Sequence, residues 1–205
     1  VAAPPAAPLQ VEPGEGLPLL LNSGRLRDQW HTMTRTGHVA RLQESEPWPT
    51  LRLGPASLLA LGAEPGSLLH LRSAQGEAHA LAARDEGLRE GEAFLPMHWS
   101  ESYAVGSGVN RLLAPRVDPL SGQPAFKQEA VRVSLRPLRW QGLWLGPQAW
   151  GLPVDWWARR PLVGAVGGGV CQWLASWIEG DDACWARLSA GGNWLRLPQA
   201  KGWLA

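Results

Sequence analysis

The sequence predicts a mainly β fold: a closed or nearly closed β-barrel with short helices, followed by a tryptophan-rich extension. Short apolar runs recur at spacings of about ten residues, some with alternating polarity, as is typical of small barrels. The chain holds 24 glycines and 18 prolines, so many turns must separate short elements. Ten of its 13 tryptophans lie beyond residue 137, where the composition changes.

The chain divides into three parts on this basis. Residues 1–16 contain four prolines and are expected to form a semi-stiff linker. Residues 17–137 form the predicted barrel domain. Residues 138–205 form the extension, whose tryptophans either make a small β-rich core of their own, as we expect, or belong to an interface.

The first elements of the barrel are expected in the following order. A buried strand over residues 18–21 is followed by a second strand over residues 50–53. A short helix over residues 56–61 follows, because Pro55 suits a first helical turn and Gly62 suits a C-terminal stop.

A hairpin comes next, with arms at residues 68–73 and 77–83. Leu69 and Leu71 alternate with polar residues in its first arm, so both are expected on the buried face. The remaining predicted elements are strands at residues 93–97 and 130–135, and, in the extension, a flexible connector at 164–169 and a hairpin with arms at 184–189 and 193–197.

The charge and the cysteines exclude several classes of protein. A formal net charge of +1 does not fit a general nucleic-acid binder, which carries a basic excess. No apolar run reaches the roughly 18 residues of a membrane span, so we expect no membrane partner either. Cys171 and Cys184 alone cannot complete a zinc or iron–sulfur site, and so few cysteines favour a reduced, cytoplasmic location.

The segment over residues 22–37 carries the densest chemistry. Its arginines outnumber its single acid, and guanidinium groups suit the oxygens of a diphosphate. Its hydroxyl groups, indole and imidazole suit a heterocycle with many polar edges. The side chains concerned are those of Arg25, Arg27, Arg35, Ser23, Thr32, Thr34, Thr36, Trp30 and His31. Residue spacing alone supports a second interpretation equally well: a solvated basic loop whose Trp30 fills the core.

This segment also resembles a known signature. The run Arg-Asp-Gln-Trp-His-Thr-Met-Thr-Arg-Thr at residues 27–36 is similar to the opening of the C-terminal domain of the molybdopterin oxidoreductases. Further similar runs follow in the family's order, at residues 62–66, 94–99, 109–110, 118–124 and 126–127. The ordered set covers residues 17–135, and its wording is closest to the assimilatory nitrate reductases.

The resemblance implies a double-psi β-barrel that binds the Mo-bis(molybdopterin guanine dinucleotide) cofactor, within an enzyme that reduces nitrate to nitrite for nitrate assimilation. Carried over residue by residue, the implied cofactor-binding positions are Ser23, Gly24, Arg25, Leu26, Arg27, Asp28, Gln29, Trp30, His31, Thr32, Thr34, Arg35, Asn110 and Lys127. Met97, His98 and Trp99 are implied to shape the substrate funnel, although His98 could equally be a buried histidine satisfied by backbone groups.

The resemblance also implies what this chain leaves to other parts of the enzyme. The family's 4Fe-4S cluster and the side chain that ligates molybdenum belong to upstream domains, so we expect no metal ligand in this chain and no activity from it alone. The expected partners are those upstream domains and an electron-donor protein or domain. Two alternatives stay open: the same domain of a formate dehydrogenase, and a non-catalytic nucleotide-binding or protein-docking module.

Overall fold

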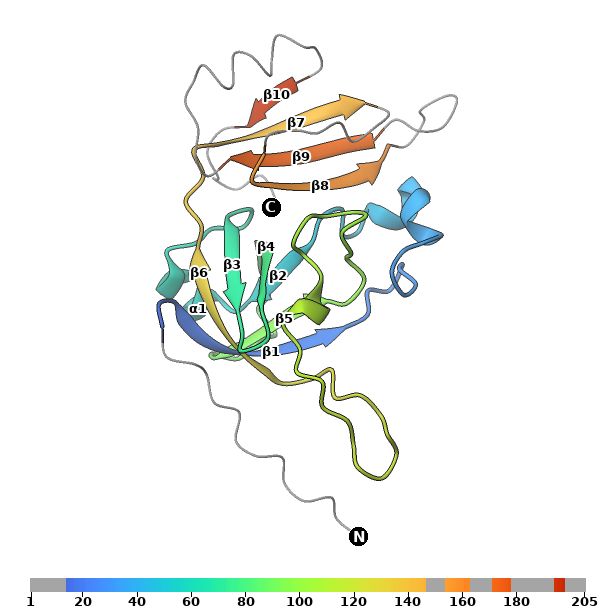
Figure 1. Cartoon of the computed structure of the whole chain (residues 1–205). Helices are drawn as coiled ribbons and strands as arrows, with labels where there is room; N and C mark the ends of the chain where they lie inside the picture. Colours follow the sequence, from blue (N-terminus) through green and yellow to red (C-terminus); the bar gives the residue numbers. More distant parts are fainter. Residues whose placement is uncertain (1–13, 147–153, 163–170, 178–193, 198–205) are drawn as a thin grey trace.

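The structure is a computed structural model that describes residues 14–146, 154–162, 171–177 and 194–197. It consists of a β-barrel and a separate four-stranded sheet that lies over one side of the barrel (Figure 1). The hairpin predicted at residues 184–189 and 193–197 and the connector predicted at residues 164–169 lie wholly or mostly outside the described residues.

Six strands close the barrel, in the order β1-β5-β2-β4-β3-β6. The pairs β1–β5 and β2–β4 are parallel, and the other pairs are antiparallel. The strands are β1 Leu17–Gly24, β2 Thr50–Leu53, β3 Leu68–Arg72, β4 Glu77–Arg84, β5 Glu92–Pro96 and β6 Glu129–Leu135. The predicted mainly β fold with a closed barrel is confirmed, in agreement with the double-psi β-barrel that the resemblance implies.

The helices are short. Helix α1 spans Pro55–Leu61 and ends, as predicted, at Gly62, whose φ of 61° lies in the left-handed region that glycine adopts without strain. The 3₁₀ helices η1 (Thr36–His38), η2 (Ala40–Gln43) and η3 (Val109–Arg111) lie in the connections between the barrel strands.

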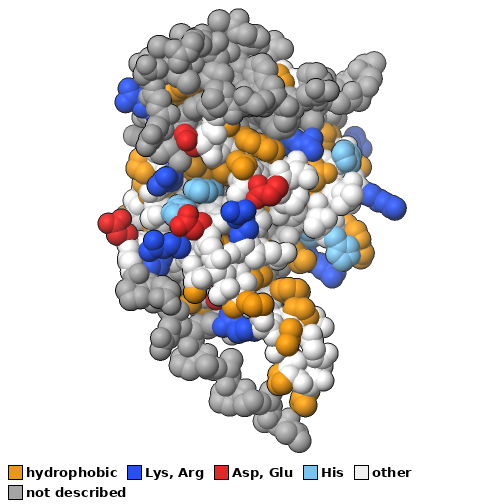
Figure 2. Space-filling view, viewed as in Figure 1, with side chains coloured by type: hydrophobic (Ala, Val, Ile, Leu, Met, Phe, Trp, Pro, Cys, Tyr) orange, Lys and Arg blue, Asp and Glu red, His pale blue; other side chains and the backbone are white. Residues whose placement is uncertain are grey.

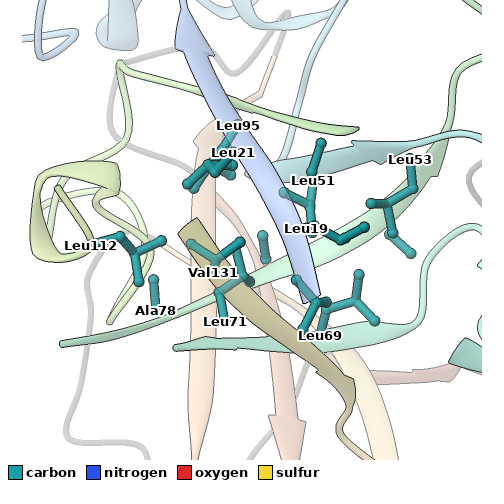
Figure 3. Packing of buried hydrophobic residues seen from close by; sticks show 14 of the residues in the cluster. Leu19, Leu21, Leu51, Leu53, Leu69, Leu71, Ala78, Leu95, Leu112 and Val131 are labelled. Atoms are coloured by element: carbon teal, nitrogen blue, oxygen red, sulfur yellow. The ribbon is translucent and has the colours of Figure 1, made fainter. Parts of the chain in front are cut away.

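Alternation along the strands builds the core of the barrel. Leu19 and Leu21 of β1 point into it, and so do Leu69 and Leu71 of β3, as the alternation predicted for that arm requires (Figure 3). Small residues of β4 at positions 78, 80 and 82 face the same interior, which leaves room for the leucines of the neighbouring strands.

The outer face of the same hairpin is also apolar in places. Leu68 and Leu81 point away from the barrel core and join a second buried cluster with Trp156, Ala158 and Leu174 of the extension. This cluster joins the barrel to the four-stranded sheet, whose order is β10-β7-β9-β8. Its strands are β7 Trp140–Gly146, β8 Trp156–Pro161, β9 Cys171–Trp177 and β10 Trp194–Leu197.

One end of the barrel gathers the segments that the sequence singled out. Because β1 and β5 are parallel, Gly24 and Pro96 leave the barrel side by side. Strand β6 runs antiparallel to β1 and therefore begins at the same end. We call this end the β1 end; the segments after β1 and β5 and before β6 meet there.

Two histidines stack on the outside of the barrel. His70 of β3 and His79 of β4 are cross-strand partners with ring centroids 4.9 Å apart, and Nε2 of His70 lies 3.1 Å from a carboxylate oxygen of Glu77. Burial, followed by the positive charge of His70, lowers the pKa of His79 to about 4. The neutral form of His79 is therefore favoured in the folded protein.

This shift predicts a pH dependence of stability. A histidine whose pKa falls on folding contributes stability that is complete above its ordinary pKa of about 6.5 and is lost as the pH falls. We therefore expect His79→Gln to flatten the decline in the free energy of unfolding between pH 6.5 and about 4. Urea denaturation across this range measures the decline, with the exposed His38→Gln as control. An unchanged slope in His79→Gln would contradict the assignment.

None of the helices in the described part of the chain is long and apolar enough to cross a membrane.

Candidate functional site

The 25–37 loop leaves the barrel at the β1 end, directly after Gly24. Its start is fixed to the segment after β5, because the backbone N–H of Met97 donates to the carbonyl of Gly24 over 2.9 Å. Its remaining course is set by side chains that alternate between the protein interior and the surface.

Buried residues anchor the loop at intervals. Leu26, Gln29 and Met33 are buried, and Met33 has no exposed surface. The amide of Gln29 donates to the carbonyl of Leu42 over 2.7 Å and accepts from the hydroxyl of Thr36 over 2.7 Å. Leu26 and Gln29, both among the implied cofactor-binding residues, therefore hold the loop in place with their side chains.

His98 holds two points of the loop, at Leu26 and His31. Its ring is fully buried, its Nε2 accepts from the backbone N–H of Leu26 over 2.9 Å, and its Nδ1 donates to the carbonyl of His31 over 2.6 Å. These two partners require the neutral imidazole with its hydrogen on Nδ1. Burial lowers the pKa of His98, and the charge of Arg25 acts in the same direction, so this form is favoured.

The residues between the anchors face outward. Trp30 is 61% exposed, so the alternative in which it fills the core is wrong. The guanidinium carbon of Arg25 lies 5.8 Å from the centroid of the Trp30 ring, and the His31 ring stands edge-on to Trp30 at 4.6 Å. The hydroxyls of Thr32 and Thr34 lie 3.1 Å apart on the same surface. In Figure 2 the edge of the molecule formed by this loop carries basic and histidine side chains.

The loop is positively charged after its internal ion pair is counted. Arg27 donates two hydrogen bonds to Asp28, of 2.9 and 2.8 Å, and Ser45 donates a third over 2.9 Å. The bonds from Arg27 and Ser45 hold the pKa of Asp28 below its usual range, so the carboxylate stays charged. Arg25 and Arg35 have no carboxylate partner among the described residues.

Lys127 reaches the start of the loop from more than one hundred residues away. Its ammonium group donates to the carbonyl of Ser23, and the buried hydroxyl of Ser23 donates to the carbonyl of Phe126 over 2.6 Å. A Cβ on Gly24 would lie 2.8 Å from the Phe94 ring, so the ring would have to shift, and an ordinary 3.5 Å from the Lys127 ammonium nitrogen. The structure thus brings Ser23, Gly24 and Lys127 together.

Lys127 ends an arm formed by residues 113–128, which projects from the barrel (Figure 1). The arm is closed by a bridge between Val117 and Pro124 and by a turn in which Asp118 accepts from the backbone and hydroxyl of Ser121. Its exposed apolar side chains are visible along the arm in Figure 2.

The remaining implied residues differ in their exposure. Asn110 is exposed on η3, and the N-cap of η3 is Gly108, where an added Cβ would lie 3.5 Å from the carbonyl oxygen of Trp99. Trp99 is buried, and Met97 is half-buried against the barrel core. The role of Met97, His98 and Trp99 in a substrate funnel stays a prediction.

Sequence reasoning missed Tyr103. Its hydroxyl donates to the carbonyl of Met33 over 2.8 Å, and its ring lies against Gly37. The only signal in the sequence is that Tyr103 is the single tyrosine of the chain, which does not predict a contact with a loop 70 residues away.

In chemical terms the site is a rigidly anchored loop that exposes guanidinium groups, hydroxyls and two aromatic faces beside a lysine. Such a surface can bind an anionic, heterocyclic ligand of the size of a nucleotide. No group of three or more histidine, cysteine, aspartate and glutamate side chains in the described ranges could hold a metal ion.

Comparisons with known proteins agree with this chemistry. The chain is 39% identical to the nitrate reductase of Klebsiella oxytoca over 169 residues, which is 79% of this chain and 20% of that protein. It is 38% identical to the nitrate reductase of Shewanella frigidimarina (strain NCIMB 400) over 156 residues, 65% of this chain and 17% of that protein. The chain thus spans about a fifth of the length of these relatives.

Among solved structures, acetylene hydratase from Pelobacter acetylenicus matches with a TM-score of 0.49 and 20% identity, over 57% of this chain and 18% of that chain. The family model of the molydopterin dinucleotide binding domain matches residues 19–130, which is more than half of the chain and includes all the implied cofactor-binding residues. The chain therefore belongs to the molybdopterin dinucleotide-binding domain family.

Proposed function

We propose that this chain is the cofactor-binding part of a cytoplasmic, assimilatory nitrate reductase that uses Mo-bis(molybdopterin guanine dinucleotide). The observation that carries the proposal is the cationic and aromatic face of the 25–37 loop beside Lys127, in a chain 39% identical to a nitrate reductase. The substrate of the whole enzyme is nitrate, and its product is nitrite.

The residues of the site fit such a cofactor by their chemistry. Arg25 and Arg35 have guanidinium groups free of carboxylates in the described part of the chain, and these groups can hold diphosphate oxygens with paired hydrogen bonds. Lys127 adds a third cation at the loop's start. Trp30 and His31 offer exposed faces against which a heterocycle can stack.

The cofactor supplies the redox-active molybdenum at which nitrate is reduced. The residues of this chain hold the dinucleotide, neutralise its phosphates and orient it. We assign the 4Fe-4S cluster, the side chain that ligates molybdenum and the docking of the electron donor to the upstream domains of the same polypeptide.

Removing the cations tests the proposal. In the intact enzyme, Lys127→Gln and Arg25→Gln are each expected to lower the affinity for the cofactor about ten-fold, because each deletes a charge-assisted hydrogen bond to phosphate. Molybdenum and guanine nucleotide per polypeptide measure the retained cofactor, and thermal unfolding of the protein measures stability. The control is Arg84→Gln, an exposed arginine of β4 that pairs with Glu86.

Cofactor retained in both variants, or lost only in proportion to stability, would overturn the role of the loop. The formate dehydrogenase alternative uses the same site and is tested by the reaction itself. We expect the intact enzyme to oxidise a reduced dye when nitrate is added. Reduction of the oxidised dye when formate is added would instead identify formate as the substrate.

A further inference from the structure

We propose that the four-stranded sheet of the extension is a brace that sets the conformation of the 25–37 loop, with Tyr103 as the positioning residue between them. The inference rests on the proposed function in so far as the loop binds the cofactor. It assigns a role to strands that lie beyond residues 19–130, the part matched by the family model.

The first step is the junction between the sheet and the barrel. Strand β8 lies at the end of the described sheet, and its free edge pairs with residues 103–105 of the barrel domain. Ala158 forms an antiparallel bridge with Ala104, the N–H of Val105 donates to the carbonyl of Trp157 over 3.0 Å, and the N–H of Arg159 donates to the carbonyl of Tyr103 over 2.8 Å. Residues 103–105 are therefore bonded to the outer edge of β8 through one isolated β-bridge and the two hydrogen bonds beside it.

The second step is that β8 fixes the Tyr103 side chain as well as its backbone. The guanidinium group of Arg159 lies over the Tyr103 ring at 5.0 Å, and it also donates to the carbonyl of Ser102 over 2.6 Å. One arginine of the sheet thus holds the segment by its backbone and by its aromatic ring.

The third step leads from Tyr103 to the loop. Its hydroxyl donates to the carbonyl of Met33, a residue with a φ of 60°, between the exposed Thr32 and Thr34. A left-handed conformation costs energy in a residue other than glycine, so surrounding contacts must maintain it. The Tyr103 hydroxyl is one such contact, and the packing of the ring on Gly37 is a second.

A second contact of β8 also supports the brace. Arg160 of β8 lies over the Trp48 ring at 5.3 Å, and Trp48 and Met33 both belong to the second buried cluster. The sheet therefore reaches the back of the loop by two routes, and the loop's outer face remains open to a ligand.

The brace predicts that Tyr103→Phe loosens the loop without unfolding the barrel. The substitution keeps the ring and removes one hydrogen bond to Met33. The control is Ser107→Ala, which removes the 3.1 Å bond from Nε1 of Trp156 to the hydroxyl of Ser107 and the 3.4 Å bond from that hydroxyl to the carbonyl of Val105. The first bond joins the sheet to the barrel and the second lies next to residues 103–104, but neither reaches the 25–37 loop.

The experiment uses the intact polypeptide, depleted of cofactor, under limited trypsin digestion. Trypsin cleaves after arginine, and mass spectrometry identifies cleavage at the exposed Arg25, Arg27 and Arg35 of the loop. We expect cleavage at these sites to be about five-fold faster in Tyr103→Phe than in the unmodified protein, as the loss of one hydrogen bond implies, and unchanged in Ser107→Ala. Equal cleavage of the loop in the two variants would overturn the brace.

A second readout separates the brace from the proposed function. In the cofactor-loaded enzyme, molybdenum release into buffer is expected to be faster in Tyr103→Phe than in Ser107→Ala. Faster cleavage of the loop together with unchanged molybdenum release would support the brace and overturn the assignment of the loop as a cofactor-binding element.

Discussion

Replacement of His98 with alanine is expected to lower the free energy of unfolding by about 3 kcal/mol and to loosen the first half of the 25–37 loop. The ring is fully buried and makes hydrogen bonds to two backbone groups of the loop, at Leu26 and His31. Alanine leaves both groups without these partners and leaves a cavity below them. Urea denaturation measures the loss, and the exposed His38→Ala is expected to change stability by less than about 0.5 kcal/mol.

The pH dependence of this difference identifies the cause. The pKa of His98 is lowered by burial, so the stability that its neutral ring contributes is complete above about pH 6.5 and falls as the pH decreases. A protonated ring would carry a hydrogen on Nε2, facing the N–H of Leu26. The difference between the unmodified protein and His98→Ala should therefore shrink below pH 6.5. A stability difference that is small at pH 8, or that grows on acidification, would contradict the role of His98 in holding Leu26 and His31.

The substitution Gly37→Ala is expected to have an effect of similar size, about 2–4 kcal/mol, for a steric reason. A Cβ at this position would lie 2.5 Å from Cζ of Tyr103 and 2.6 Å from its hydroxyl oxygen. The ring cannot retreat without loss, because it is buried and its hydroxyl is bonded to Met33. Either the ring or the loop must therefore move.

A second glycine provides the control for this experiment. At Gly108 an added Cβ would meet its nearest atom, the carbonyl oxygen of Trp99, at an ordinary 3.5 Å. Gly108→Ala is expected to leave stability unchanged or to raise it by about 0.5 kcal/mol, because alanine restricts the unfolded chain. Thermal and urea denaturation should show that Gly37→Ala is clearly less stable than Gly108→Ala. Equal stability of the two would show that the loop adapts freely around Tyr103.

The barrel could be predicted from the sequence because local patterns determine its parts. Alternation placed Leu69 and Leu71 in the core, and the pair of Pro55 and Gly62 bounded helix α1. The strand ends were less accurate: β1 extends to Gly24 because it pairs with β5 there, and that pairing is not visible in the local sequence.

The candidate site could be predicted only in part. The composition of the 25–37 loop indicated its chemistry, and the resemblance indicated Lys127. The contacts that give the loop its shape come from His98 and Tyr103, which lie about 70 residues further along the chain. Contacts of that range depend on which strands are neighbours in the barrel, and alternation in a single sequence does not determine strand order.

The exposure of Trp30 shows the same limit. A large aromatic side chain in a loop fills the core in many proteins, and spacing alone did not decide between that role and a binding surface. In the structure Met33 occupies the interior position and Trp30 stays outside, because the loop turns through the left-handed conformations of His31 and Met33.

The central claim is that the outer face of the 25–37 loop, together with Lys127, binds the dinucleotide part of the cofactor. Titration of the isotopically labelled chain with guanosine diphosphate, followed by backbone amide NMR, tests it most directly. We predict weak binding, with shifts concentrated between Ser23 and Arg35 and at Lys127. Shifts confined to strands β7–β10, with those amides unmoved, would contradict the claim.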